Sequence, residues 1–307
     1  MHAKITLLPG SAPGSAACEY AEQLLTDISA AFDHSFSLYR GKTEEEPSEK
    51  TLSLCESSQG ILLGNAQDPR AAALYDALGL PLRIRSFCVP EALCGRRERP
   101  VKLWIGTVLS LDEDTLRLAM QEAFRFAREE DAHILSVSPT GQSKAAWDAA
   151  VRVQGASNPV VAVDFIGAPE AAAALVRDPG RMGLLLCPPY AGSILEAAAT
   201  ASCRHPELLF DCLPDDECAI LGPCLNEYAA CAAAPPFSMA LAVSRMLRVS
   251  LHLSREAACL DAAIQNVMAN HPMQGEGSAQ EAQECLELMC SQIAVAGELM
   301  GKGGYLP

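Results

Sequence analysis

Arginine is concentrated in one short segment of an otherwise acidic chain. Five arginines fall between residues 83 and 99, in the string RIRSFCVPEALCGRRER. A planar guanidinium binds a carboxylate through two parallel hydrogen bonds, so this grouping indicates a site for an anionic ligand. A solvated surface loop would carry the same residues, and for Arg96, Arg97 and Arg99 that alternative stays open.

Residues 175–201 have the pattern of a strand that runs into a helix. A Pro-Gly turn precedes an apolar run from Met182 to Leu186, a Pro-Pro pair follows, and a helix is predicted to open near Gly192. In α/β proteins the N–H groups of such a helix and the loop before it converge on bound ligands. We therefore expect chemistry where this strand ends.

The register of this segment resembles that of the NAD-dependent β-decarboxylating dehydrogenases, the isocitrate and isopropylmalate dehydrogenases. In that family an LVR-x-P-x-x-F-D segment is followed by a strand and by N-x-F-G-D-I-L-S-D, whose two aspartates hold Mg²⁺. Ser193 and Ala197 stand at those positions here. The resemblance aligns Asp164 with a third metal carboxylate, and Glu196 would add an oxygen only if its helix were rotated. Mg²⁺ requires a near-octahedral shell of oxygens, so this metal site would be incomplete.

Four further residues match the family's cofactor-binding positions. The L-P-G opening is kept, with Gly10 in the turn. Gly222 and Pro235 keep the register of the loop that wraps the adenosine of NAD in the family, and Asn226 replaces its ribose-binding aspartate. The resemblance implies NAD as cofactor, but an amide lacks the charge-assisted strength of a carboxylate.

The family's substrate arginines and catalytic pair are matched only in part. Arg85 corresponds to the first arginine, in L-R-P, and Arg96 or Arg97 corresponds loosely to the second. The catalytic lysine is replaced by Pro139, which has no proton to transfer, and Lys144 is the nearest substitute. The catalytic tyrosine and most of the arm that crosses to the partner subunit have no counterpart.

Composition excludes two classes of protein. A net charge of −15 and a pI near 4.8 argue against binding to a nucleic acid backbone. No run approaches the roughly 20 apolar residues that span a bilayer, and the N-terminal apolar run is too short for a secretory signal. A cytoplasmic protein that binds neither nucleic acid nor membrane is expected.

The chain contains 13 cysteines and no CxxC pair. Several of them fall near His205, between Cys203 and Cys231, which would suit a soft metal. Their irregular gaps match no common ligand spacing, so buried free thiols are the favoured interpretation.

The resemblance covers nearly the whole chain in order and implies an isopropylmalate dehydrogenase-like α/β fold with two domains. We expect a long mixed sheet with helices on both faces. Residues 1–95 and 205–307 would form the larger domain, and residues 96–204 the central dimerisation domain. The family assembles as a homodimer.

Because the metal aspartates, lysine and tyrosine are missing, we expect a catalytically silent or repurposed homologue that retains a carboxylate-binding cleft. Two alternatives remain open. One is an active NAD- and Mg²⁺-dependent decarboxylase of a 2-hydroxy acid, which would use Lys144, Glu196 and Asp164. The other is a structural or regulatory subunit of an active relative.

Overall fold

A computed structural model describes all residues except 11, 95–99, 216–217, 226–235, 272–277 and 303–307. The chain forms two compact units: Met1–Leu78 with Asp216–Pro307 (unit 1), and Gly79–Asp215 (unit 2). These boundaries differ from 95/96 and 204/205 because the strand after Gly79 pairs entirely with strands of unit 2. None of the described helices is long and apolar enough to cross a bilayer.

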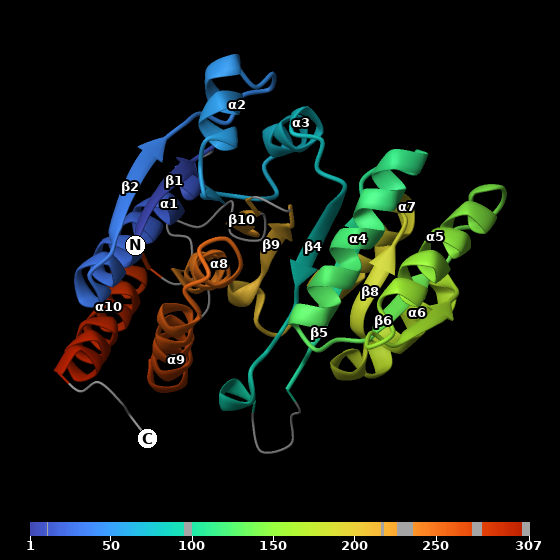
Figure 1. Cartoon of the computed structure of the whole chain (residues 1–307). Helices are drawn as coiled ribbons and strands as arrows, with labels where there is room; N and C mark the ends of the chain where they lie inside the picture. Colours follow the sequence, from blue (N-terminus) through green and yellow to red (C-terminus); the bar gives the residue numbers. More distant parts are fainter. Residues whose placement is uncertain (11, 95–99, 216–217, 226–235, 272–277, 303–307) are drawn as a thin grey trace. The chain divides into compact units, whose positions relative to one another are not determined.

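Unit 1 contains a parallel sheet with the strand order β2-β1-β3-β10. Its strands are β1 (His2–Leu8), β2 (Ser35–Arg40), β3 (Gly60–Leu63) and β10 (Ile220–Pro223). Its helices are α1 (Ala12–Phe32), α2 (Glu49–Glu56), α3 (Pro69–Ala77), α8 (Pro236–Val249), α9 (Ser254–Asn270) and α10 (Ala279–Lys302). The helices α1, α8, α9 and α10 pack against one another (Figure 1).

The strand β1 alternates between polar and apolar residues from His2 to Leu7, and its second half is buried on both faces. Ile5 and Leu7 are fully buried on one face. On the other face, Thr6 Oγ1 lies 2.7 Å from the hydroxyl oxygen of Ser58, just after α2. The buried polar residue Thr6 is thus tolerated because it is hydrogen-bonded.

Unit 2 contains a mixed sheet with the strand order β9-β4-β5-β8-β6-β7, in which β4 is antiparallel to both β5 and β9. Its strands are β4 (Leu82–Ser86), β5 (Leu103–Val108), β6 (Ile134–Val137), β7 (Val163–Ile166), β8 (Gly183–Cys187) and β9 (Phe210–Leu213). Its helices are α4 (Glu113–Glu129), α5 (Ser143–Ser157), α6 (Ala168–Arg177) and α7 (Pro189–Ser202), with short 3₁₀ turns η1 (Glu91–Leu93), η2 (Pro179–Arg181) and η3 (Pro206–Leu208).

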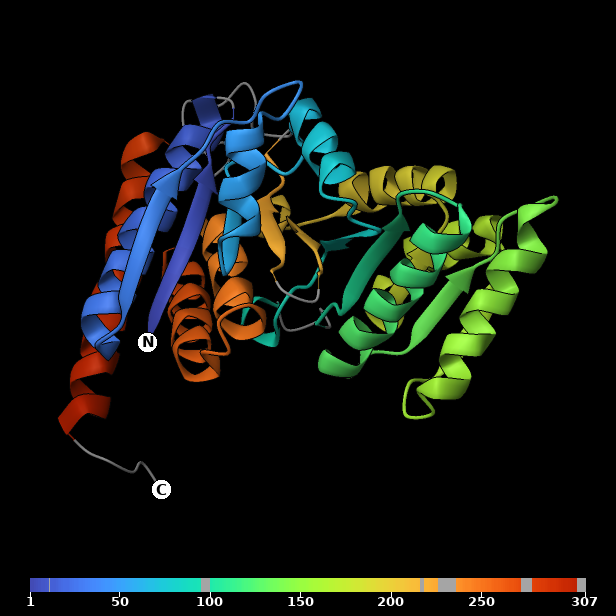
Figure 2. The same ribbon diagram turned by 45° about the horizontal axis from the view of Figure 1, so that its top comes forward.

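The helices of unit 2 cover the two faces of its strands. In Figures 1 and 2, α4 and α5 lie on one face and α6 and α7 on the other. The α4 face holds a core that includes Leu82, Ile84, Trp104 and Phe124. The expected α/β class is confirmed, with a parallel sheet in unit 1 and a mixed sheet with helices on both faces in unit 2.

The alternation of β4 sends its two arginines away from this core. Side chains along a strand point alternately to opposite faces. Because Leu82 and Ile84 face α4, Arg83 and Arg85 face α7. The helix α7 approaches β5 closely at Gly192, where an added Cβ would lie 2.3 Å from Thr107 Oγ1. A charged set of residues therefore meets under α7.

Candidate functional site

Two arginines, two carboxylates and one threonine meet on the α7 face of unit 2. We call Arg83, Arg85, Thr107, Glu196 and Asp211 the arginine–carboxylate cluster. Its members come from β4, β5, α7 and β9. Arg85, Thr107, Glu196 and Asp211 are buried, and 23% of the Arg83 side chain is exposed.

Arg85 and Asp211 form a bidentate pair. Arg85 Nε donates to Asp211 Oδ1 at 2.7 Å, and Nη2 donates to Oδ2 at 2.8 Å. The two residues are direct partners in the antiparallel register of β4 and β9. The Asp211 side chain is 0% exposed, so this pair is shielded from solvent. Charge-assisted bidentate bonds of this kind fix both geometry and protonation.

Glu196 reaches the arginines from α7. Arg83 Nη2 donates to Glu196 Oε2 at 2.7 Å, and Arg85 Nη1 lies 3.4 Å from the same oxygen. Thr107 Oγ1 donates to Glu196 Oε1. Burial opposes the charge on Arg83, but Asp211 and Glu196 raise its pKa above the ordinary value. The guanidinium therefore stays charged inside the cluster.

The cluster is electrically balanced, because its two guanidinium groups face two carboxylates. A buried charge is tolerated when it is paired and hydrogen-bonded. Arg83 Nε is 3.8 Å from Asp211 Oδ2 and has no hydrogen-bond partner among the described residues. Nearby on β8, burial and the negative charge of Glu196 raise the pKa of the Cys187 thiol well above its ordinary value. An anionic ligand would have to compete with the cluster's own carboxylates.

The residues predicted to bind substrate and the residue predicted to transfer a proton do not lie together among the described residues. Arg85 lies in the cluster, while Arg96 and Arg97 are outside the described residues. Lys144 is in the first turn of α5, where Nζ lies 2.8 Å from Asp148 Oδ2. Burial opposes the charge on Asp148, but its bonds to Lys144 and to Ser138 leave its pKa below the ordinary value.

Sequence reasoning missed Arg83 and Asp211. Leu82 and Arg83 form a leucine–arginine pair, so Arg83 matches the L-R of the family motif better than Arg85 does. The match of Arg83 could therefore have been found from the sequence alone. The pairing of Asp211 could not, because it depends on the register between β4 and β9.

The two metal candidates are in different surroundings. Asp164 is exposed on β7, paired in the sheet with Leu135. Glu196 is buried, with its side chain 5% exposed, because α7 directs it toward Arg83 and Thr107. Among the described residues, no three His, Cys, Asp or Glu side chains are grouped so that they could hold a metal ion.

The cofactor candidates of unit 1 surround a tight turn. Gly10 has φ 67°, and an added Cβ there would lie 2.9 Å from Asp68 Oδ2. Asp68 caps α3 and pairs with Arg70 at 2.6 Å. At Gly222 an added Cβ would lie 2.8 Å from the backbone oxygen of Leu63. A carboxylate therefore lies beside the Gly10 turn.

The other two cofactor candidates, Asn226 and Pro235, are outside the described residues.

The cysteines in the described part of the chain are free thiols. Cys212 and Cys224 are buried, and Cys203 is half-buried. Burial raises the pKa of Cys18 and Cys88 to about 12. The interpretation as buried thiols is thus confirmed for the buried members, while Cys231 lies outside the described residues.

The sequence is similar to enzymes of one kind, although no protein-family model matches it. It is 23% identical to 3-isopropylmalate dehydrogenase of Shouchella clausii, over 88% of this chain and 90% of that enzyme. It is 24% identical to 3-isopropylmalate dehydrogenase of Nitratidesulfovibrio vulgaris, over 88% of this chain and 92% of that enzyme.

Solved structures show the same fold. A β-decarboxylating dehydrogenase from Thermococcus kodakarensis matches with a TM-score of 0.79 at 18% identity, covering 99% of this chain and 100% of that one. Isocitrate dehydrogenase from Methylococcus capsulatus matches with a TM-score of 0.79 at 14% identity, covering 96% of this chain and 100% of that one.

The mixed strand order, the two units and these likenesses define the fold class of the decarboxylating dehydrogenases. In sequence the chain is similar over most of its length to 3-isopropylmalate dehydrogenases, and it has the fold of the isocitrate/isopropylmalate dehydrogenases.

Proposed function

We propose that this chain is a catalytically silent or repurposed member of the family. The observation that carries the proposal is the arginine–carboxylate cluster. Glu196 and Asp211 bind the guanidinium groups of Arg83 and Arg85 with the geometry that a substrate carboxylate would use. The chain thus supplies its own anions at the arginines that the resemblance assigns to substrate.

A free carboxylate ligand would gain little binding free energy at such a site. To reach Arg85 it would have to displace Asp211, which would then be a buried charge without its partner. Breaking one side of a buried pair costs about 3–5 kcal/mol, comparable to the binding free energy of a millimolar ligand. This balance argues against a retained carboxylate-binding cleft at Arg85.

The residues present do not fit Mg²⁺, which the resemblance implies. The ion needs several oxygen ligands in octahedral geometry. Glu196 is engaged by Arg83 and Thr107, and Asp164 is exposed on β7. NAD is also implied, but beside the Gly10 turn the Arg70 guanidinium is bound by the Asp68 carboxylate and is not available to a phosphate. We therefore derive no reaction step through either group.

The alternative of an active dehydrogenase has less support. It would require Lys144 as the proton carrier and Glu196 with Asp164 as metal ligands. Lys144 is paired with Asp148 on the surface of α5, and Glu196 is paired with Arg83 in the cluster.

The outer face of α7 supports a homodimer as part of the proposal. The only charged residue of α7 is Glu196, which points inward. Tyr190 and Ile194 are 80% and 49% exposed, and Ala197 and Ala201 are also exposed. This spacing of four, three and four residues gives an apolar seam of the kind that pairs two helices. We propose that a second copy of this chain covers the seam. The face is uncharged, so two chains of net charge −15 can meet there without placing like charges against each other.

The experiment is a search for turnover and binding in the purified chain. We expect no oxidation of isopropylmalate, isocitrate or malate with NAD and Mg²⁺, and no heat of binding for either cofactor by titration calorimetry. An authentic 3-isopropylmalate dehydrogenase, assayed in parallel, controls for the conditions. Appreciable oxidation of any of the three acids would overturn the silent interpretation. A gain in thermal stability with Mg²⁺ or Mn²⁺ would favour the active alternative.

A further inference from the structure

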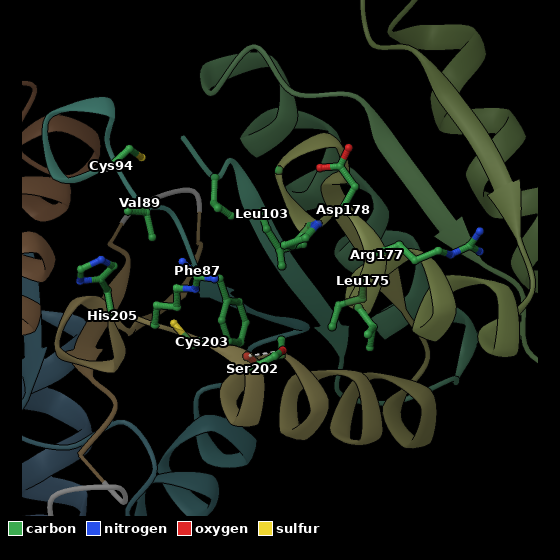
Figure 3. Close-up of a pocket in the computed structure, with 16 residues that line it drawn as sticks. Phe87, Val89, Cys94, Leu103, Leu175, Arg177, Asp178, Ser202, Cys203 and His205 are labelled. Atoms are coloured by element: carbon green, nitrogen blue, oxygen red, sulfur yellow. Dashed lines mark hydrogen bonds between the residues drawn. The ribbon is translucent and has the colours of Figure 1, made fainter. Parts of the chain in front are cut away.

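Unit 2 contains a cavity that is separate from the arginine–carboxylate cluster. Its volume is about 470 Å³, which is within the range of small-molecule sites. It lies where the end of β4, the start of β5, the turn after α6 and the end of α7 come together (Figure 3). Phe87 and Ala199 line the cavity and follow the cluster residues Arg85 and Glu196 by two and three positions, but no residue belongs to both sites.

Most of the cavity wall is apolar. The apolar lining includes Phe87, Val89, Val101, Leu103, Leu175 and Ala199. Phe87, Leu103 and Leu175 are each less than 5% exposed, so these walls are fixed by the core around them. Such a wall binds the hydrocarbon or aromatic part of a ligand through burial of apolar surface.

The polar lining is concentrated in one stretch of chain. The consecutive residues 202–205 follow the last turn of α7 and supply a hydroxyl, a thiol, a guanidinium and an imidazole. His205 Nδ1 lies 2.9 Å from Glu207 Oε1, which directs the other ring nitrogen away from that carboxylate. Ser202 Oγ is already bonded to the carbonyl oxygen of Ala198 at 2.7 Å. Arg204 and His205 therefore define the polar end.

The charges around the cavity differ between its two sides. Figure 3 shows Asp178 on the side opposite His205. Arg177 points away from the cavity, and its Nε donates to the carbonyl oxygen of Ala173 at 3.1 Å. The side formed by residues 202–205 thus carries the guanidinium of Arg204 and the imidazole of His205, which is bonded to Glu207, and the other side carries the carboxylate of Asp178. An acidic group on a ligand is favoured at the former and repelled at the latter.

We propose that this cavity binds a small apolar molecule with a single acidic group, whose apolar part contacts Phe87, Leu103 and Leu175 and whose acidic group faces Arg204 and His205. The site is independent of the proposed loss of catalysis, because it shares no residue with the cluster.

The test uses the fluorescent probe 1-anilinonaphthalene-8-sulfonate, which combines an apolar ring system with one sulfonate. We expect saturable binding of one probe per chain. Val101→Trp fills the cavity and should weaken binding about tenfold or more, equivalent to about 1.4 kcal/mol. Val153→Trp, on an α5 position that is 69% exposed, is the matched control and should leave the affinity unchanged.

The role of the acidic group is tested separately. Arg204→Gln should weaken the sulfonate probe and leave the neutral probe N-phenyl-1-naphthylamine unaffected. Equal binding of both probes, with no effect of this substitution, would overturn the assignment of an acidic ligand.

A second readout covers the case in which Val101→Trp does not fold. Bound probe should slow alkylation of Cys203 by iodoacetamide in the unmodified chain, measured on the peptide that carries it. Cys259, which does not line the cavity, serves as the internal reference. Absence of saturable binding, unchanged affinity in a folded Val101→Trp variant, or unprotected Cys203 would each overturn the site.

Discussion

Arg83 on β4 and Glu196 on α7 are joined by an ion pair of 2.7 Å, and both residues also face the bidentate pair of Arg85 and Asp211. The helix that carries the metal aspartates in the resemblance thus carries a carboxylate that is directed at arginines instead. In α7, Ser193 and Ala197 stand at the aspartates of the family string, and Glu196 makes an internal contact.

Glu196→Ala should destabilise the chain by about 3–5 kcal/mol, because it leaves two buried guanidinium groups short of a counter-charge. Urea unfolding measures the change. Asp114→Ala is the control: that side chain is 90% exposed and its pair with Arg117 is 3.9 Å long, so a change within about 0.5 kcal/mol is expected. Added formate should restore part of the loss in the Glu196 variant, and chloride at equal ionic strength should not. An equal response to both salts would contradict the idea that Glu196 replaces a ligand carboxylate.

The pair of Arg85 and Asp211 should behave as one unit. Arg85→Met and Asp211→Leu alone each leave a buried charge and should cost about 3–5 kcal/mol. The double variant removes both charges and should be more stable than either single variant, with a coupling energy above about 1 kcal/mol in a double-mutant cycle. Additive losses would show that the two side chains do not depend on each other.

Gly192→Ala should destabilise unit 2 by about 1–3 kcal/mol through overpacking, because the new methyl group would lie 2.3 Å from Thr107 Oγ1. Gly155→Ala on α5 is the matched control. There the nearest atom, of Phe124, is 3.7 Å away, and the substitution should stabilise by about 0.5–1 kcal/mol through helix propensity. The sign of the two changes in thermal unfolding is the measurement, and equal signs would argue against a close approach of α7 to β5.

Asp112→Ala should lower the melting temperature at neutral pH by removing the N-cap of α4. Bonds with Ser110 and with the backbone N–H of Thr115 lower the pKa of Asp112 from 3.8 to about 2. Since the folded-state pKa is depressed, the stabilisation is present above the unfolded value of 3.8 and is lost as pH falls through about 2. The difference in melting temperature between the two proteins should therefore shrink over that window. A difference that does not change with pH would contradict the capping role.

Ile194→Lys should convert the proposed homodimer to monomer by placing a charge in the apolar seam of α7. Light scattering after size exclusion measures the mass. Val153→Lys, at an α5 position that is 69% exposed, should leave the dimer intact. A dimer in the first variant, or a monomeric native chain, would remove α7 as the interface.

Much of the architecture could be predicted from periodicity. The apolar residues Leu116, Ala119, Met120, Ala123 and Phe124 recur at helical spacing, and the helix α4 buries all of them. In this segment a local signal fixes both the type of element and the buried side.

Two elements of unit 1 were missed for identifiable reasons. The helix α2 directly follows a segment of three glutamates and Pro47, a composition typical of solvated surface. Its local signal is the N-cap at Ser48, which accepts a hydrogen bond from the N–H of Thr51. The strand β2 is an edge strand with half-buried and exposed residues, so its apolar signal is weak.

The candidate site was predicted only where local motifs describe it. The position of Arg85 near the site follows from the sequence, whereas the pairing of Arg83, Glu196 and Asp211 depends on which face α7 presents and on the register of β9. Those are long-range properties, and a one-residue slip in register would move each side chain to the opposite face.

The inward carboxylate of α7 also sets the order of any attempt to engineer activity back into this chain. Aspartates introduced at Ser193 and Ala197 would add negative charge to a helix that already carries Glu196, while both arginines would stay occupied. Neutral replacements at Glu196 and Asp211 would have to come first, together with new packing to offset the lost pairs. The proposed loss of function would therefore rest on residues that were gained as well as on residues that disappeared.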